Sequence, residues 1–174
     1  MRQLLLLRHA KSSWDDSSLS DHDRPLSHRG RRAAAALREA MRGLGLEPDL
    51  VLVSSALRTQ QTLAALQPFE ETPLIETLDA LYLATQAQML RLLNGVAQTA
   101  RSVMLVGHNP GMQELAQALT GSAADPAAAE CMARKFPTGA LAEFAVPGPW
   151  SSLGPGGARL VRFLCPRDLS AAAD

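Results

Sequence analysis

Leu4-Leu5-Leu6-Leu7-Arg8-His9 is a run of four leucines followed directly by two polar side chains. No polar residue alternates with the leucines, which is typical of a strand buried on both faces of a sheet. Residues 50–53 and 103–106 are apolar runs of the same kind. The three runs therefore predict a central sheet that is covered on both faces.

Helical patterns separate these predicted strands along the chain. Apolar residues recur every three or four positions in four segments, which are residues 33–44, 56–66, 85–100 and 110–119. Gly43 and Gly45 are the expected stops of the first helix, and Ser54 and Ser55 are possible caps of the second. Asn109 is the expected N-cap of the fourth helix, with Pro110 at its first position. Alternating strands and helices predict an α/β fold. We expect a single domain over residues 1–174, with three α/β/α layers and a mostly parallel central sheet.

The C-terminal part of the chain has a different pattern. Residues 140–146 and 158–164 are strand-like, and a connection rich in Gly and Pro, residues 147–157, joins them. The Ala-rich residues 123–129 fit either a weak helix or a mobile loop, and residues 73–75 fit a short strand. We therefore expect further strands beside the three apolar ones.

Length and composition exclude several classes of protein. The chain has 174 residues, enough for one domain with its own core. Its 17 basic and 17 acidic residues balance, which argues against general nucleic-acid binding, and no apolar stretch is long enough for a membrane span. Cys131 and Cys165 lack the spacing of a disulfide framework or a metal site, so we expect reduced thiols in a cytoplasmic protein.

Polar residues gather directly after the three predicted buried strands. Arg8 and His9 follow the first strand, residues 54–58 follow the second, and His108 with Asn109 follows the third. The carboxyl ends of parallel strands meet at one edge of a sheet, where the ligands of open α/β sheets bind. We therefore expect two histidines and two arginines in one pocket.

This combination of side chains suits a phosphate ligand. The guanidiniums of Arg8 and Arg58 offer planar forks of donors to an oxyanion, and a neutral histidine among them can attack phosphorus. Each residue also has a structural alternative. Arg58 could cap a helix or pair with Glu70, and His108 could be a hydrogen-bonded core residue. The convergence of three clusters on one edge favours the phosphate site.

Several segments resemble the motifs of the histidine phosphatase superfamily. The first motif is Arg8-His9-Ala10-Lys11-Ser12, with Ala10 where the family usually has Gly, and the segment that follows it is Asp23-Arg24-Pro25-Leu26-Ser27 with Arg29-Gly30. The second motif is Ser54-Ser55-Ala56-Leu57-Arg58-Thr59, and the third is Gly107-His108-Asn109-Pro110-Gly111. The likeness extends over about residues 3–145. It is strongest to the small SixA-like phosphohistidine phosphatases.

The resemblance implies a phosphoglycerate mutase-like fold and a role for each matching residue. His9 would be the nucleophile, which forms a phosphohistidine intermediate. Arg8, Arg58 and His108 would bind the phosphoryl oxygens and stabilise the transition state. Arg24, at the rim of the pocket, and Asn109, beside His108, are further candidates for substrate binding.

The position of a general acid is less sharply marked. Larger members of the superfamily place a carboxylate between the second and third motifs, and Glu76 and Asp79 lie there. The position of Asp79 shortly before Tyr82 favours Asp79, although either carboxylate could simply be solvated. A phosphohistidine leaving group needs less help from an acid, because its P–N bond breaks readily once the imidazole is protonated.

Other phosphatase and nucleotide-binding chemistries lack their signatures in this sequence. Neither cysteine is followed six residues later by an arginine, and no P-loop, dinucleotide fingerprint or nucleophile elbow is present. His22 and His28 have no metal-ligand spacing with another His or Cys. We therefore expect a mechanism that needs neither a metal ion nor a cofactor.

Three functions fit these observations. The first is a phosphatase for phosphohistidine in a phosphorylated protein, such as a phosphorelay or phosphocarrier protein. Residues 59–107 leave little chain for a large lid, and a pocket without a lid would admit a side chain carried on another protein. The second is a phosphomonoesterase for a small phosphoester. The third is a phosphoprotein-binding module without turnover, against which the presence of both His9 and His108 argues.

Overall fold

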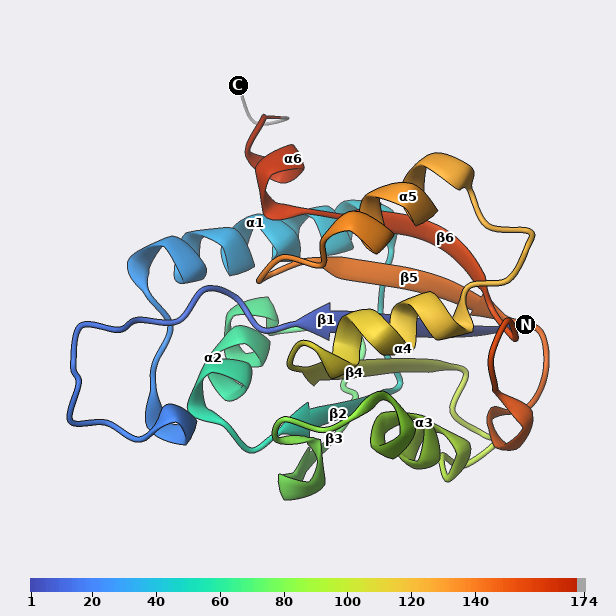
Figure 1. Ribbon diagram of the computed structural model, residues 1–174, viewed down its shortest axis with the longest axis horizontal. Helices are drawn as coiled ribbons and strands as arrows, with labels where there is room; N and C mark the ends of the chain where they lie inside the picture. The colour runs from blue at the N-terminus through green and yellow to red at the C-terminus, as the bar shows by residue number, and fades with distance from the viewer. Residues whose placement is uncertain (172–174) are drawn as a thin grey trace.

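Six strands form one sheet in the computed structural model, which describes residues 1–171 (Figure 1). The strands are β1 (Arg2–Arg8), β2 (Leu50–Ser54), β3 (Leu74–Leu78), β4 (Ser102–Gly107), β5 (Leu141–Val146) and β6 (Arg159–Leu164), in the spatial order β3-β2-β4-β1-β5-β6. The first four run parallel to one another, whereas β5 is antiparallel to both β1 and β6. The prediction of an α/β fold with a mostly parallel central sheet is confirmed.

Helices cover both faces of this sheet. The first face carries α1 (His28–Leu44), α2 (Leu57–Leu66) and the short α6 (Pro166–Ala171), and the second carries α3 (Gln86–Asn94), α4 (Gly111–Leu119) and α5 (Pro126–Arg134). Three single turns of 3-10 helix complete the order, namely η1 (Asp21–Asp23), η2 (Asp79–Leu81) and η3 (Trp150–Ser152). The predicted three-layer arrangement is therefore present.

The four leucines of β1 explain why the sheet is buried on both sides. Leu4 and Leu6 belong to the core beneath α3, α4 and α5, whereas Leu5 and Leu7 belong to the core beneath α1 and α2. Side chains alternate between the faces of a strand, so an unbroken apolar run serves two cores at once. All four leucines are fully buried.

Several predicted boundaries need correction. The helix predicted over 85–100 ends at Asn94, where Gly95 follows. The N-cap of α2 is Ala56, without a side-chain cap, and the N-cap of α4 is Pro110 instead of Asn109. Both ends lie beside the polar clusters, whose side chains make tertiary contacts that a local pattern does not encode.

The C-terminal region also differs in part from expectation. Residues 126–134 form α5, so the Ala-rich segment 123–129 is helical from Pro126 onward and is a turn before it, and the sequence pattern predicted no helix at α6. Trp150, which the loop 147–157 carries, is fully buried and donates its Nε1–H to the carbonyl of Ala100 at 2.8 Å. Within residues 1–171, no helix has the length and apolarity that crossing a bilayer requires.

Candidate active site

The carboxyl ends of β1, β2 and β4 surround one cavity of about 450 Å³. Arg8 is the last residue of β1 and His9 follows it, Arg58 lies in the first turn of α2, and His108 directly follows β4. All four side chains line this cavity. The structure thus brings together the two histidines and two arginines that the sequence placed at one edge of the sheet.

His9 is held in one orientation by its own backbone neighbour. Its Nδ1 lies 2.7 Å from the carbonyl oxygen of Ala10, which can only accept, so Nδ1 carries the ring proton. The lone pair of Nε2 then receives the Nε–H of Arg58 at 3.4 Å. Burial, and then the charges of Arg58, Arg8 and Arg24, lower the pKa of His9 to about 4. His9 is therefore a neutral imidazole with a fixed tautomer at neutral pH.

His108 faces His9, with the two ring centroids 5.3 Å apart. The Nδ1 of His108 lies 3.4 Å from Nη2 of Arg58, and its Nε2 lies 2.7 Å from Oγ of Ser54. A guanidinium can only donate, so Nδ1 accepts and the proton sits on Nε2, where it points to Ser54. Burial and the neighbouring His9 and Arg58 lower the pKa of His108 to about 3, so this ring is also neutral.

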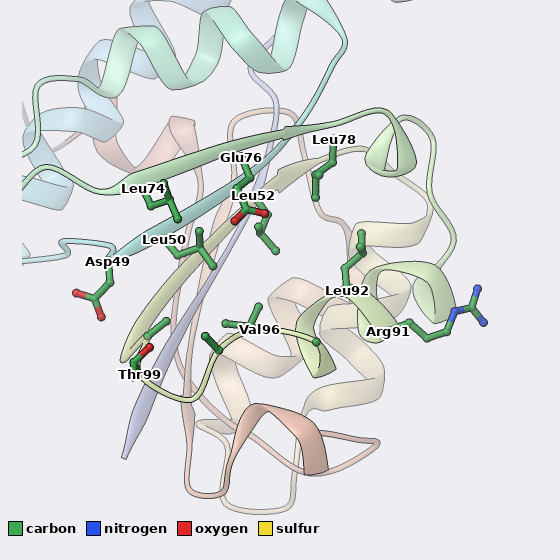
Figure 2. Close-up of a pocket in the computed structure, with 13 residues that line it drawn as sticks. Asp49, Leu50, Leu52, Leu74, Glu76, Leu78, Arg91, Leu92, Val96 and Thr99 are labelled. Carbon is green, nitrogen blue, oxygen red and sulfur yellow. The ribbon is translucent and has the colours of Figure 1, made fainter.

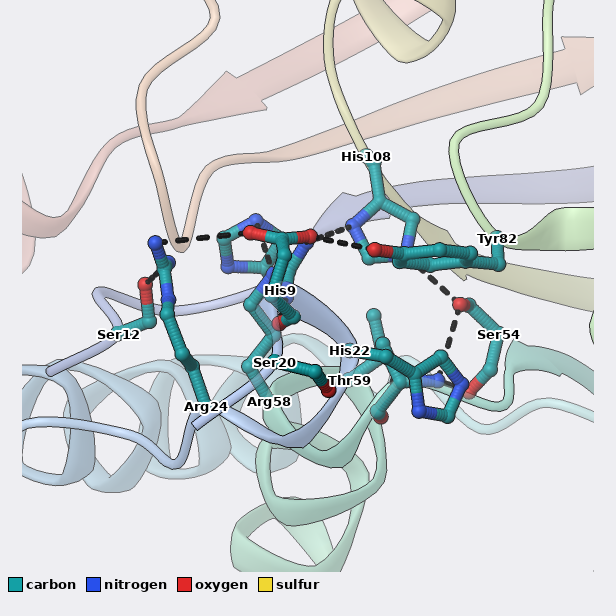
Figure 3. A network of polar contacts seen from close by, with 12 residues as sticks. His9, Ser12, Ser20, His22, Arg24, Ser54, Arg58, Thr59, Tyr82 and His108 are labelled. Carbon is teal, nitrogen blue, oxygen red and sulfur yellow. Dashed lines mark hydrogen bonds and ion pairs between the residues drawn. The ribbon is translucent and has the colours of Figure 1, made fainter. Parts of the chain in front are cut away.

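Arg58 is the centre of the polar network in Figure 3. Only 4% of it is exposed, and all three of its guanidinium nitrogens face the cavity, where they contact His9, His108 and Asp21. Neither structural alternative, a helix cap or a pair with Glu70, describes these contacts. The first turn of a helix also directs backbone N–H groups and a positive dipole towards the same space.

Two further arginines enrich the cavity in positive charge. Arg8 donates from Nη1 to the carbonyl of Phe136 at 2.9 Å, and Arg24 donates from Nη2 to Oγ of Ser12 while its guanidinium stacks on the ring of Trp14. The Nε of Arg8 and the Nε and Nη1 of Arg24 are buried without a hydrogen-bond partner. Unpaired buried donors are costly, and an anion in the cavity would satisfy them.

The charges that line the cavity are unequal. The lining contains one carboxylate, that of Asp21, and five cationic side chains, which are Arg8, Lys11, Arg24, Arg58 and Lys135. Asp21 accepts hydrogen bonds from Nη2 of Arg58 at 3.1 Å and from the hydroxyl of Tyr82 at 2.5 Å. This excess of positive charge favours a ligand with two or more negative charges.

Asn109 lines the cavity as expected, but its side chain forms hydrogen bonds within the protein. Its Nδ2 donates to the carbonyl of Phe136 at 3.0 Å, and its Oδ1 accepts the N–H of Gln113 at 3.3 Å. Arg8 donates to the same Phe136 carbonyl, so Asn109 helps to hold the loop that also anchors Arg8.

The structure does not bring the two candidate acids to this cavity. Asp79 begins η2 with an exposed side chain, and it is absent from the lining. Glu76 is exposed on edge strand β3 and lines a separate, mainly apolar cavity beside α3 (Figure 2). That cavity is larger, about 680 Å³, but it holds neither the histidines nor Arg8 and Arg58.

Asp21, Ser54 and Tyr82 make polar contacts in the site, although the sequence patterns gave Asp21 and Tyr82 no role there and indicated Ser54 only as a possible helix cap. Asp21 lies three residues before Arg24 and outside the segment Asp23–Ser27 that resembles the family, so no motif marked it. Tyr82 packs edge-on against His108, and His22 packs against Tyr82 while bonding Oγ of Ser55 at 3.0 Å. His22 therefore supports the site and is more than a loop residue.

Ala10 fits its position without strain. Its N–H donates to Oγ1 of Thr62 at 3.0 Å, and it is not among the described residues with a positive φ, so a methyl group is tolerated where the family usually has Gly. In the described part of the chain, no group of three or more His, Cys, Asp or Glu side chains is arranged to hold a metal ion.

Comparisons with known proteins agree with this architecture. Residues 4–82 match the model of the histidine phosphatase superfamily (branch 1). An uncharacterised protein of Mycobacterium tuberculosis (strain ATCC 25618 / H37Rv) is 38% identical over 162 residues, which make up 92% of this chain and 100% of that protein.

Two solved structures are also similar over nearly the whole chain. A protein from Nakamurella multipartitia, assigned as phosphohistidine phosphatase SixA, is 33% identical, with a TM-score of 0.83 over 95% of this chain and 96% of its own. A protein from Agrobacterium tumefaciens with the same assignment is 32% identical, with a TM-score of 0.77 over 94% of this chain and 97% of its own.

Proposed function

Since this chain belongs to the histidine phosphatase superfamily, we propose that it hydrolyses phosphohistidine carried by another protein. The observation that carries the proposal is the environment of His9, a neutral imidazole whose Nε2 lone pair faces a cavity lined by Arg8, Arg24 and Arg58. A nucleophile needs its lone pair, and a phosphoryl group needs cations, so the same cavity supplies both.

The reaction would proceed in two steps. Nε2 of His9 attacks phosphorus, the leaving imidazole of the substrate departs with a proton, and the phosphoryl group is carried on His9. Water then attacks this phosphoenzyme, which releases inorganic phosphate and restores His9. Arg8 and Arg58 bind the phosphoryl oxygens in both steps, His108 donates to them when its ring proton sits on Nδ1 instead of Nε2, and Arg24 adds charge from the wall of the cavity.

A second cavity supports a protein as the substrate. It is about 660 Å³ in volume, and it shares Lys11, Lys135, Pro137 and Thr138 with the cavity that His9 and His108 line, which we call the histidine cavity. Its remaining cations are Arg29, Arg134 and Arg167, of which Arg134 pairs with Glu130 and Arg167 with Asp168. We name this basic groove the Lys11–Lys135 cleft. Its charge suits an acidic surface next to the phosphorylated side chain.

Phosphoenzyme trapping tests the proposal directly. The purified protein is mixed for milliseconds with a phosphohistidine-carrying protein in EDTA, then quenched in alkali, because N-linked phosphate survives base and is lost in acid. We expect labelled phosphate on His9 and release of inorganic phosphate without added metal. Release from p-nitrophenyl phosphate but not from phosphohistidine would favour a metabolite phosphatase instead. Binding without any release would favour the non-catalytic module.

A further inference from the structure

Asp21 occupies the place where a phosphoryl group has to bind. Its Oδ2 lies 3.1 Å from Nη2 of Arg58, and its Oδ1 lies 3.6 Å from Nη1 of Arg24. These are cations of the histidine cavity, and Arg58 also contacts Nε2 of His9. Figure 3 shows His9, Arg24, Arg58 and Tyr82 converging on this space. An incoming phosphoryl group must therefore displace the carboxylate from both arginines.

The side chain of Asp21 can move while its backbone stays in place. The side chain is 48% exposed, so solvent lies beside it. The backbone oxygen of Asp21 accepts Nη1 of Arg58 at 2.6 Å, and the next residue, His22, is tied to Ser55 and packed against Tyr82. The displaced carboxyl group thus remains beside the phosphoryl group, on the open side of the cavity. A leaving group opposite His9 would lie on that side, because the attack is in line.

Displacement also changes the charge that Asp21 prefers. In the free enzyme, the Tyr82 hydrogen bond and the charges of Arg58 and Arg24 hold the pKa of the Asp21 carboxyl below its ordinary value. Tyr82, Arg24 and Arg58 are the groups that face the carboxylate, and His9 and His108 behind them are neutral. When a phosphoryl dianion takes the arginines, the carboxyl group loses their charge and faces an anion, and both changes favour its protonated form.

We propose that Asp21 is the proton donor to the leaving group, and that the substrate releases it for this role by taking its place on Arg58 and Arg24. The proposal rests on the proposed function. The protonated carboxyl gives its proton to the leaving nitrogen or oxygen as that atom's bond to phosphorus breaks and the bond from His9 Nε2 to phosphorus forms. The resulting carboxylate then takes a proton from the attacking water as the His9–phosphorus bond breaks.

The other candidate acids, Asp79, Glu76 and Tyr82, are less suited to donate this proton. Asp21 is the one carboxylate among the described residues that line the cavity, whereas Asp79 and Glu76 lie outside that lining. Tyr82 reaches Asp21, but burial and the bond to Asp21 raise the pKa of its phenol, which makes Tyr82 a poorer donor. The proton is therefore assigned to Asp21.

The test compares leaving groups in Asp21→Asn. Asparagine keeps the size of the side chain but can neither carry the proton nor compete as an anion. For phenyl phosphate, with a poor leaving group, we expect kcat/KM to fall by about 10²-fold or more. For p-nitrophenyl phosphate, whose leaving group needs little protonation, we expect a fall of less than about tenfold. Vanadate, a phosphate mimic, should inhibit the variant at a lower concentration than the wild type.

These opposite changes separate catalysis from structural damage. A variant that was merely misfolded would lose both substrates equally and would bind vanadate more weakly. Asp15→Asn is the matched control on the same loop, because Asp15 is exposed and outside the cavity lining, and Asp79→Asn tests the carboxylate that the sequence favoured as the acid. Both should behave as wild type.

Two results overturn the assignment. One is an unchanged kcat/KM of Asp21→Asn for phenyl phosphate, and the other is an equal loss for both aryl phosphates. Failure of the proposed function would look different, since the wild-type protein would then form no phosphoenzyme on His9 from a phosphohistidine protein, whatever Asp21→Asn did.

Discussion

The reactivity of His9 depends on which ring nitrogen carries its proton. The carbonyl of Ala10 accepts a hydrogen bond from Nδ1–H, so Nε2 keeps the lone pair, and burial together with the surrounding guanidiniums lowers the pKa of the ring and keeps it neutral. The backbone geometry just after β1 therefore prepares the proposed nucleophile before any substrate arrives. Such preparation is useful because no proton has to leave the ring during the attack.

Replacing His9, the proposed nucleophile, should end turnover. In His9→Ala we expect the release of phosphate from p-nitrophenyl phosphate to fall by at least ~10³-fold, because the variant lacks the imidazole proposed to receive the phosphoryl group. His28→Ala is the control, since His28 is exposed at the start of α1 and outside the cavity lining. His22 is unsuitable as a control because it contacts Ser55 and Tyr82. Equal losses in His9→Ala and His28→Ala would contradict the assignment.

Titration of the two buried rings gives a prediction about pH. Because the pKa of His9 is lowered to about 4 and that of His108 to about 3, both rings stay neutral as the pH falls through 6.5, where a free imidazole gains its proton. The attacking form of His9 is thus lost only near pH 4. NMR of the substrate-free protein should show no titration of these two rings between pH 8 and 5. A midpoint near 6.5 for His9 would contradict this picture.

Sequence patterns predicted some of these residues and missed others for a physical reason. Arg8, His9 and His108 lie at strand ends, and Arg58 lies in the first turn of α2, shortly after β2, so the order of strands and helices is enough to bring their backbones to one edge of the sheet. Asp21 and Tyr82 lie on turns that tertiary contacts hold in place, such as the bond between Arg58 and the Asp21 carbonyl. No local pattern encodes such contacts.

At the scale of elements, helix α1 holds the loop that follows β1. Gly30, in the first turn of α1, lies so close to that loop that an added Cβ would sit 2.1 Å from the carbonyl oxygen of Lys11. The neighbouring Ser12 binds Arg24, so this close approach also positions an arginine of the cavity. The glycine is required by the contact between two elements and not by its own φ angle.

Gly30→Ala should therefore destabilise the protein and disturb the site together. We expect the free energy of unfolding in urea to fall by ~1–3 kcal/mol, because backbone atoms cannot yield as a flexible side chain does. Gly43→Ala is the matched control in the same helix, where a Cβ meets nothing within 4 Å. It should raise stability by ~0.5–1 kcal/mol through helix propensity. A neutral Gly30→Ala would show that the Lys11 backbone can shift freely.

The predicted helices were most accurate where the apolar pattern was strong and least accurate at their ends. The stop at Gly45 is confirmed, because that residue adopts the left-handed conformation that ends α1, with φ of 63°. The stop expected at Gly43 is wrong, because α1 continues through it to Leu44. The helix predicted over 85–100 was wrong beyond Asn94, although Ala97 continues its apolar spacing. There the chain turns after Gly95, and Asn94 donates to the carbonyls of Trp150 and Leu153.

At the scale of the whole molecule, the chain is neutral but its charge is unevenly placed. It has 17 basic and 17 acidic residues, yet cations dominate the histidine cavity and the adjoining Lys11–Lys135 cleft. Both lie beside the carboxyl end of β1. Uneven charge of this kind guides an anionic partner to one side of a protein.

Reversing one charge of the cleft should therefore affect a protein substrate and spare a small one. Arg29 is exposed, lines the Lys11–Lys135 cleft and lies outside the histidine cavity. In Arg29→Glu we expect kcat/KM for a phosphohistidine protein to fall at least roughly threefold while kcat/KM for p-nitrophenyl phosphate is unchanged, because only the protein reaches the cleft. Arg101→Glu is the control, since Arg101 is exposed at the amino end of β4, away from the cleft.

Salt should abolish the same difference. Raising the ionic strength from about 0.1 M to 1 M shortens the Debye length from about 10 Å to about 3 Å, so the cleft then contributes little to the encounter. The rates of wild type and Arg29→Glu on the protein substrate should converge in high salt, while a ratio that stays constant would mean that Arg29 acts through structure. If Arg29→Glu and Arg101→Glu slowed the protein substrate equally at low salt, the cleft would have no special part in docking. The small-molecule phosphatase would then be the better description of this enzyme.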